Sequence, residues 1–329
     1  MLGGVVMNGL TEERKLLEDK INKLIAGDEQ LKGFYEYMLV NDNSLTTIYD
    51  TLAKVKVFLT NLDKSVSELN AKDYAKHMLD KRVTGDGELS TSTYKRGIYY
   101  ALKKFTSYLE FTGELSYNPM EQITIPANKD SQKTIEKREK GFLTDDEIVL
   151  VLHDVEKSTP KREKWKSRDR AIIEVFLITG IRCSALYKLD VDSVDMKNRT
   201  LIVTDKGGKV KRCDMPEVLI NHMEEWLCDR EEILDGKIEE ALFISNRLKR
   251  VSKRNIEDIV HKYADVLGRD ISPHKLRATY GTRIYDKTKD IVMVQECMGH
   301  SNIETSRIYV RGRKDSLKQA SEIMAQSIN

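Results

Sequence analysis

The second half of the chain holds side chains whose types and spacing suit the binding of an anion and the transfer of protons. Ser272 and Pro273 are typical of a helix start, and they place His274 and Arg277 three residues apart on one helix face. Three further motifs carry reactive side chains: Arg182 in Thr179-Gly180-Ile181-Arg182, His300 in Met298-Gly299-His300, and Tyr309 nine residues after that histidine. Guanidinium groups bind anionic oxygens through a planar fork, and imidazoles exchange protons near neutral pH. Each motif alone is common by chance, whereas the full set in one chain is a specific signal.

Taken in chain order, from Thr179 to Tyr309, the motifs resemble those of the tyrosine recombinase (phage integrase) family. That family has an arginine in a T-G-x-R turn, a lysine in a β-hairpin, H-x-x-R, a G-H pair, and a tyrosine nine residues beyond that histidine. The run from Ser44 to Tyr49, followed by Phe58, is similar to the start of the family's helical core-binding domain. The resemblance covers about 28 to 329. It implies a mainly α fold with a small β-hairpin or sheet in the C-terminal half.

The resemblance also implies a role for each matching residue. Tyr309 would be the nucleophile, and Arg182 and Arg277 would clamp the scissile phosphate, where charge grows during attack. His274 would serve in proton transfer, and His300 would donate a further hydrogen bond to the phosphate.

A hairpin lysine would protonate the departing 5′-oxygen. Lys206 is our choice, because a Lys-Gly pair stands at the turn. Lys209 is the alternative, since the hairpin to Pro216 looks about two residues longer than the family's usual form. One residue departs from the family's R-x-S-E-L pattern: Ala185 stands where the acidic residue is expected, so another carboxylate would have to take its place or turnover would suffer.

The activity that the resemblance implies is site-specific recombination or integration of DNA, through a 3′-phosphotyrosine intermediate and with no metal or other cofactor. The partners would be double-stranded DNA with specific core sites and three further copies of the chain, giving a homotetramer on two duplexes. A final helix with apolar positions at Leu317, Ala320, Ile323 and Met324 would dock on a neighbouring copy or on its own domain. A type IB topoisomerase and a non-catalytic DNA-binding relative, for which Ala185 is the one hint, are the alternatives. Phage integration, transposon movement and chromosome-dimer resolution all stay open as biological roles.

Apolar periodicity and linker composition divide the chain into parts. We expect an N-terminal helical extension over 1–27, a helical core-type DNA-binding domain over 28–126, an exposed linker over 127–140, and a mixed α+β catalytic domain over 141–329. The linker is rich in Lys, Gln, Ser and Glu and nearly free of large apolar residues.

Local signals predict the elements of the second half. Thr144 with Glu147 forms a capping-box signature for a helix from Asp145 to about Val155. A buried apolar helix over Ala171 to Thr179 should end at Gly180. Strands are expected over Arg199 to Asp205 and Val210 to Met215, joined as a hairpin, and a further short strand over Leu242 to Ser245.

Charge is unevenly distributed along the chain. The net formal charge of +2 argues weakly against a polyanion partner, but it averages basic blocks over 91–108, 161–170 and 247–254 with an acidic block over 224–240. We expect the basic side chains of the first and third blocks to contact DNA phosphates or grooves: Lys95, Arg96, Lys103, Lys104, Arg247, Lys249, Arg250, Lys253 and Arg254. The acidic block should face away from the duplex.

The remaining signals concern the compartment. No apolar run approaches the length of a membrane span, and the apolar start from Met1 to Leu10 lacks a basic leader. The four cysteines are far apart, which suits reduced thiols and does not suit a zinc site or a disulfide framework. We therefore expect a cytoplasmic protein that associates with the nucleoid when it binds DNA.

Overall fold

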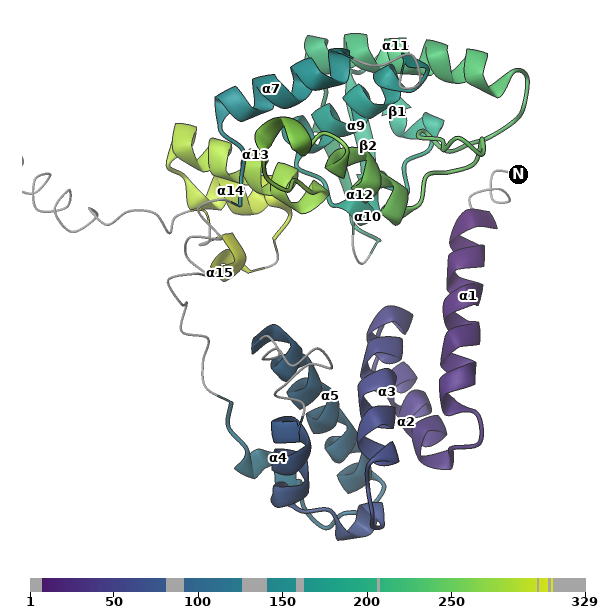
Figure 1. The fold of residues 1–329 in the computed structure, drawn as a ribbon, viewed down its shortest axis with the longest axis vertical. Coiled ribbons are helices and arrows are strands. Elements are labelled where there is room, and N and C mark those ends of the chain that lie inside the picture. Colours follow the sequence, from purple (N-terminus) through teal and green to yellow (C-terminus); the bar gives the residue numbers. More distant parts are fainter. Residues whose placement is uncertain are drawn as a thin grey trace, which may run out of the picture. The chain divides into compact units, whose positions relative to one another are not determined.

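The computed structural model describes residues 8–80, 92–125, 141–157, 163–205, 208–300, 302–306 and 309. The chain divides into two compact units, Met1–Lys129 and Asp130–Asn329 (Figure 1). The described residues are mostly helical, and a three-stranded antiparallel sheet lies in the second unit, so the predicted fold class is confirmed. The predicted linker lies outside the described residues, and the domain boundaries proposed from the sequence stay predictions.

The first unit is a bundle of helices packed around aromatic side chains. Its described α-helices are α1 (Asn8–Ile25), α2 (Glu29–Val40), α3 (Leu45–Thr60), α4 (Ala71–Asp80) and α5 (Ser92–Phe111). The hydroxyl of Ser44 caps α3 by accepting a hydrogen bond from the backbone N–H of Thr47, at 3.3 Å. Phe34 of α2 meets Phe105 of α5 edge to face, with centroids 5.2 Å apart, and both rings are fully buried. The buried aromatic faces hold the helices together and leave charged faces to solvent.

The second unit is built around one central helix. Its described α-helices are α7 (Asp145–Glu156), α9 (Lys166–Thr179), α10 (Cys183–Leu186), α11 (Glu217–Leu234), α12 (Lys253–His261), α13 (Pro273–Thr288), α14 (Ile291–Met298) and α15 (Ile303–Ser306). Helix α9 contacts α7, α11, α12 and α13, and ten of its 14 residues are buried. In Figure 1, α11 lies along the opposite edge of this unit from α10 and α12.

The local signals of the sequence are largely confirmed in this unit. Thr144 and Glu147 form the expected capping box at the start of α7. Helix α9 ends at Gly180, whose φ of 59° is the left-handed conformation that glycine adopts without strain. A side chain there would also collide with the ring of Tyr280, since an added Cβ would lie 2.1 Å from its Cδ1.

The predicted hairpin is confirmed, and a short strand extends it. Strand β2 (Thr200–Thr204) pairs with β3 (Val210–Asp214), with Thr204 opposite Val210 at the open loop, and β1 (Val194–Asp195) pairs with the other edge of β2. The strand expected over Leu242 to Ser245 is wrong. This stretch forms only isolated bridges, because its backbone hydrogen bonds go to two different segments of the chain. Leu242 N–H donates to Leu189 O on one side, and Phe243 O accepts from Val251 N–H on the other.

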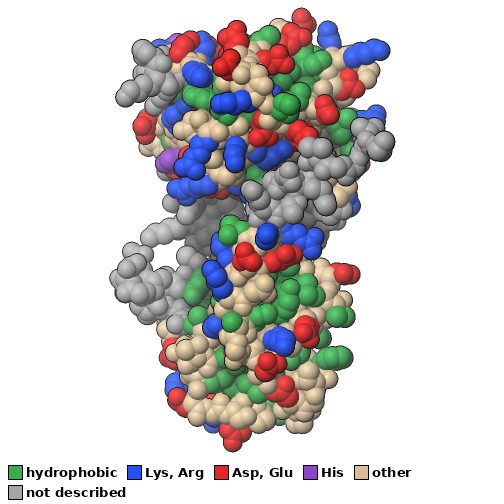
Figure 2. All heavy atoms as spheres, turned by 90° about the vertical axis from the view of Figure 1, so that its right-hand side faces the viewer, with side chains coloured by type: hydrophobic (Ala, Val, Ile, Leu, Met, Phe, Trp, Pro, Cys, Tyr) green, Lys and Arg blue, Asp and Glu red, His purple; other side chains and the backbone are tan. Residues whose placement is uncertain are grey.

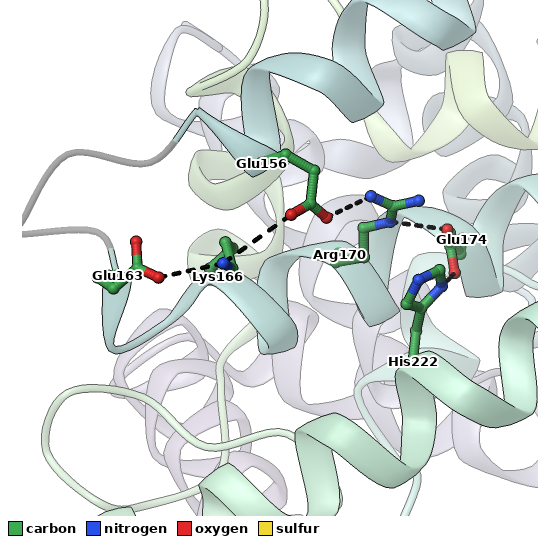
Figure 3. Close-up of polar contacts among 6 residues, drawn as sticks. All are labelled: Glu156, Glu163, Lys166, Arg170, Glu174 and His222. Atoms are coloured by element: carbon green, nitrogen blue, oxygen red, sulfur yellow. Dashed lines mark hydrogen bonds and ion pairs between the residues drawn. The ribbon is translucent and has the colours of Figure 1, made fainter.

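A polar network of alternating charge joins α7, α9 and α11 (Figure 3); its members are Glu163, Lys166, Glu156, Arg170, Glu174 and His222. Arg170 lies at its centre, pairing with Glu156 of α7 and donating from Nε to Glu174 Oε1 at 2.8 Å. The second oxygen of Glu174 is 2.7 Å from Nδ1 of His222 on α11. The network holds α7 and α11 against α9. The C-terminal end of α9 leads into the turn that carries Arg182.

A second polar cluster is more deeply buried. The carboxylate of Asp169 on α9 is fully buried, and Oδ1 accepts from Nε of Arg168 at 2.9 Å. Its Oδ2 pairs with Nζ of Lys262 and accepts from the hydroxyl of Tyr263 at 2.9 Å. Because every partner donates to an ionised carboxylate, the charge of Asp169 holds the segment after α12 against α9.

Replacing Asp169 with Asn tests this cluster. We expect a loss of about 3–5 kcal/mol in the free energy of unfolding, because buried Arg168 and half-buried Lys262 would lose the counter-ion of their charges. Urea unfolding followed by tryptophan fluorescence measures this unit, since Trp165 and Trp226 are the only tryptophans in the chain. Asp214→Asn, an exposed position on β3, is the matched control and should change stability by less than about 0.5 kcal/mol. Equal stability of the two variants would contradict the assignment.

Candidate active site

Arg277 lies at the centre of the candidate site. It projects from α13, is 7% exposed, and its guanidinium donates from Nη1 to Gly180 O and from Nη2 to Met298 O, the latter at 2.5 Å. Burial lowers the pKa of Arg277 to about 10, and the nearby charge of Arg182 acts in the same direction. The two carbonyls belong to the T-G-x-R turn and the M-G-H turn, so one side chain fastens both turns.

Arg182 is brought to the same place by the turn that follows α9. It is the N-cap residue of α10, and its side chain is 34% exposed. One terminal nitrogen, Nη1, pairs with the carboxylate of Asp205 at the end of β2, and Nη2 donates to Gly299 O at 3.4 Å. The two arginines therefore donate to successive carbonyls, Arg277 to Met298 O and Arg182 to Gly299 O. Of the two guanidinium groups, that of Arg182 is the more exposed to solvent.

His300 follows the left-handed Gly299 directly. Its Nδ1 is 2.9 Å from Oγ of Ser306 on α15, and burial together with the charges of Arg277 and Arg182 lowers its pKa to about 4. The imidazole is therefore neutral at neutral pH. When the Ser306 hydroxyl donates to Nδ1, the ring proton lies on Nε2, which makes that nitrogen a hydrogen-bond donor.

Tyr309 completes the cluster. Its ring is nearly parallel to that of His300, at 7°, with centroids 6.4 Å apart. It also packs on Gly281 of α13, where an added Cβ would lie 2.8 Å from Cζ of the tyrosine. Burial raises the pKa of Tyr309, while Arg277 and Arg182 act against this rise. The structure thus brings together Arg182, Arg277, His300 and Tyr309.

The other predicted catalytic residues are placed differently. His274 is exposed in the first turn of α13, and no described residue hydrogen bonds to its imidazole. Lys206 lies outside the described residues. Its rival Lys209 is exposed, and its carbonyl accepts from the backbone N–H of Asp205 at 2.8 Å, which closes the base of the hairpin loop.

Sequence reasoning missed two residues of this site. Asp205 and Ser306 contact Arg182 and His300, and neither belongs to a motif. Ala185, where a carboxylate was expected, is 2% exposed and packs in the apolar core. The carboxylate at Arg182 comes instead from Asp205, directly after β2, and its position directly before Lys206 was the available signal.

The basic residues expected to contact DNA differ in their solvent exposure and in the contacts that they already make within the chain. On α5, Lys103 and Lys104 are exposed, with Lys104 donating to Asn43 Oδ1 at 2.6 Å, while Lys95 and Arg96 are half-buried. The remaining five lie at the start of α12 or in the segment before it. Arg247, Lys249 and Arg254 are exposed there, and Lys253 lies over the ring of Tyr187 at 5.1 Å. Figure 2 shows Lys and Arg side chains interspersed with acidic ones on one face of each unit.

Arg250 is held by the chain's own backbone. Its Nη1 donates to the carbonyls of Tyr187 at 3.1 Å and Leu189 at 2.9 Å, and its Nη2 pairs with Asp190. These contacts stabilise the segment that follows α10.

No described helix is both long enough and apolar enough to cross a membrane. In the same part of the chain, no three His, Cys, Asp or Glu side chains are placed to hold one metal ion.

Comparison with known proteins identifies the family. The sequence profile of the phage integrase family matches residues 141–315, more than half of the chain. The chain belongs to the phage integrase family. It is a tyrosine recombinase, an enzyme of site-specific DNA recombination.

Relatives and solved structures agree with this family. The chain is 32% identical to tyrosine recombinase XerC of Shewanella amazonensis over 211 residues, 64% of this chain and 67% of the relative. It is 26% identical to XerC of Alcanivorax borkumensis over 285 residues, 79% and 90% of the two chains.

The fold is similar to that of XerH recombinase bound to a palindromic difH substrate in a post-cleavage complex, with a TM-score of 0.66, 23% identity, and coverage of 85% of this chain and 80% of that one. It is also similar to a lambda integrase dimer bound to a COC′ core site, with a TM-score of 0.65, 16% identity, and coverage of 87% and 96%.

Replacing Gly281 with Ala tests the placement of Tyr309. The added methyl group would displace the phenol ring, so the pKa of Tyr309 should fall towards the ordinary value of about 10. Alanine is favoured over glycine in a helix by about 1 kcal/mol, so the global fold should persist. NMR titration of the tyrosine side chains measures the change. Gly97→Ala, on α5 of the other unit, is the control and should leave Tyr309 unchanged; an unchanged Tyr309 in both variants would contradict the contact.

Proposed function

We propose that this chain is a site-specific DNA recombinase or integrase that cleaves and rejoins duplex DNA through a 3′-phosphotyrosine intermediate, without a metal ion or ATP. The observation that supports this most strongly is the convergence of Arg182, Arg277, His300 and Tyr309 from four segments of the chain. A phosphodiester gains negative charge on its non-bridging oxygens during attack, and fixed guanidinium groups stabilise that charge.

In the proposed reaction, Oη of Tyr309 attacks the scissile phosphorus. An O–P bond to the tyrosine forms as the bond from phosphorus to the 5′-oxygen breaks, and the 5′-oxygen takes a proton from Lys206, with Lys209 as the alternative acid. Rejoining is the same exchange in reverse, with a 5′-hydroxyl of the partner strand as nucleophile. Because no water enters, the phosphodiester bond is conserved without an energy source.

The charge states of the site fit these roles. Neutral His300 can donate from Nε2 to a phosphate oxygen without adding a further positive charge. Tyr309 must lose its proton despite burial, and the two arginines favour the phenolate that forms. The proton that Tyr309 loses would be taken up by His274, which is exposed one turn from Arg277.

The partners are proposed on the same basis. We expect duplex DNA with specific core sites, contacted by exposed Lys103, Lys104, Arg247, Lys249 and Arg254. The solved relatives XerH and lambda integrase are described as complexes with their DNA sites. A homotetramer on two duplexes, docking of the final helix on a neighbouring copy, and a role in a mobile element stay proposals. The residues of that helix lie outside the described part of the chain.

A suicide substrate tests the proposed function. The full chain is incubated with a nicked duplex that carries its own flanking repeat, and the covalent protein–DNA adduct is measured on a denaturing gel. We expect an adduct with the wild-type chain and a loss of roughly 10³-fold or more in Tyr309→Phe, which lacks the nucleophilic oxygen. Tyr117→Phe, at an exposed tyrosine of the first unit, is the matched control and should form adduct normally.

The outcomes separate the alternatives. Specific binding without any adduct would reject the enzyme and favour a DNA-binding relative. An adduct accompanied by relaxation of supercoils, with no recombinant product, would favour a topoisomerase.

A further inference from the structure

Asp205 occupies an unusual place for a carboxylate, beside a guanidinium expected to bind phosphate. It follows β2, its side chain is 20% exposed, and Oδ2 pairs with Nη1 of Arg182. The same oxygen lies over the M-G-H turn, 3.5 Å from where a Cβ on Gly299 would be. A carboxylate here either holds Arg182 in place or competes with DNA for it.

The geometry of Arg182 favours the first possibility. A guanidinium has five N–H donors in a fixed plane. Asp205 takes a donor on Nη1 and Gly299 O takes one on Nη2, so the described residues leave Nε and one hydrogen on each terminal nitrogen for a phosphate. Two fixed acceptors orient the plane, whereas a side chain that is 34% exposed would otherwise sample several rotamers.

The electrostatics of the site point the same way. Arg182 and Arg277 repel each other, and the described hydrogen bonds of Arg277 go to neutral carbonyls. Burial and Arg182 lower the pKa of Arg277, and Asp205 opposes them; it also opposes the lowering of the pKa of His300. Asp205 thus offsets the repulsion that accumulates when the two cations are brought together.

Asp205 also closes the loop that carries both candidate acids. Its backbone N–H donates to Lys209 O at 2.8 Å, and its carbonyl accepts from Gly208 N–H at 3.2 Å. Farther along the same hairpin, Nζ of Lys211 donates to Cys297 O, next to the M-G-H turn. One residue therefore joins the base of the lysine loop to the phosphate-binding guanidinium.

We infer that Asp205 is a positioning residue for strand cleavage: its carboxylate orients Arg182 for the scissile phosphate and fixes the base of the lysine loop beside it. The inference rests on the proposed function. The opposite reading, in which the carboxylate blocks Arg182 until DNA displaces it, gives the opposite effect on rate.

The kinetic test compares Asp205→Asn with wild type on the nicked substrate under single-turnover conditions. We expect adduct formation to slow by roughly tenfold to hundredfold, and Asp205→Glu, which keeps the carboxylate, to recover part of that loss. Asp214→Asn removes the same charge from the exposed end of the hairpin and should leave the rate unchanged. An unchanged rate in Asp205→Asn would overturn the proposal, and a faster rate would establish the blocking role.

The pH profile separates positioning from a merely structural role. The charged and titratable groups that face Arg277 are Arg182, Asp205, Tyr280, Tyr309 and His300. Removing a negative charge from the site lowers the pKa of the groups around it, so the alkaline limb of the rate profile should move to lower pH in Asp205→Asn and stay in place in Asp214→Asn. A slower variant with an unmoved limb would indicate loss of structure alone.

A measurement without DNA keeps this inference distinct from the proposed function. In the free wild-type chain, the Nη signals of Arg182 in NMR spectra should show restricted rotation, which Asp205→Asn should release. Free rotation in wild type would overturn the proposal even if a variant failed to fold. Restricted rotation in a chain that forms no adduct would reject the proposed function and the role in cleavage, and leave only the contact.

Discussion

The candidate site depends on one buried guanidinium. Arg277 is 7% exposed and donates to the carbonyls of Gly180 and Met298, which are 97 and 21 residues away along the chain. Backbone carbonyls at helix ends need partners, and Arg277 supplies them at the ends of α9 and α14 together. The turns that present Arg182 and His300 are therefore held by the residue that would also bind the phosphate.

This arrangement brings the positive charges of Arg277 and Arg182 together at a largely buried position, which is electrostatically unfavourable. Burial and the neighbouring arginine lower the pKa of Arg277 to about 10, and the same arginines lower that of His300 to about 4. The site therefore presents two cations and a neutral imidazole at neutral pH, with Asp205 as a partial counter-charge. Such a site is suited to an anion whose charge increases during reaction, and the scaffold of α9, α11 and the sheet keeps it fixed.

Local signals in the sequence were sufficient for much of the fold. The capping box at Thr144, the stop at Gly180 and the hairpin depend on neighbouring residues, and all three are confirmed. The strand expected over 242–245 failed because its backbone partners come from distant segments, which periodicity does not report.

The site shows the same limit. The order of the motifs indicated which residues meet, but not that Asp205 would contact Arg182 from 23 positions away, or that Arg277 would bond to two turns. Position 185 shows what a motif leaves out: the expected acid is missing from α10, and the carboxylate of Asp205, directly after β2, reaches Arg182 instead.

Amide hydrogen exchange in Arg277→Lys is the most direct test of this central role. Lysine keeps the positive charge but lacks the planar fork that reaches two carbonyls. The protected N–H groups of Gly180, Gly299 and His300 should all exchange faster, by about tenfold or more, while those of α11 keep their wild-type rates. Unchanged exchange at either turn would contradict the claim that Arg277 holds both.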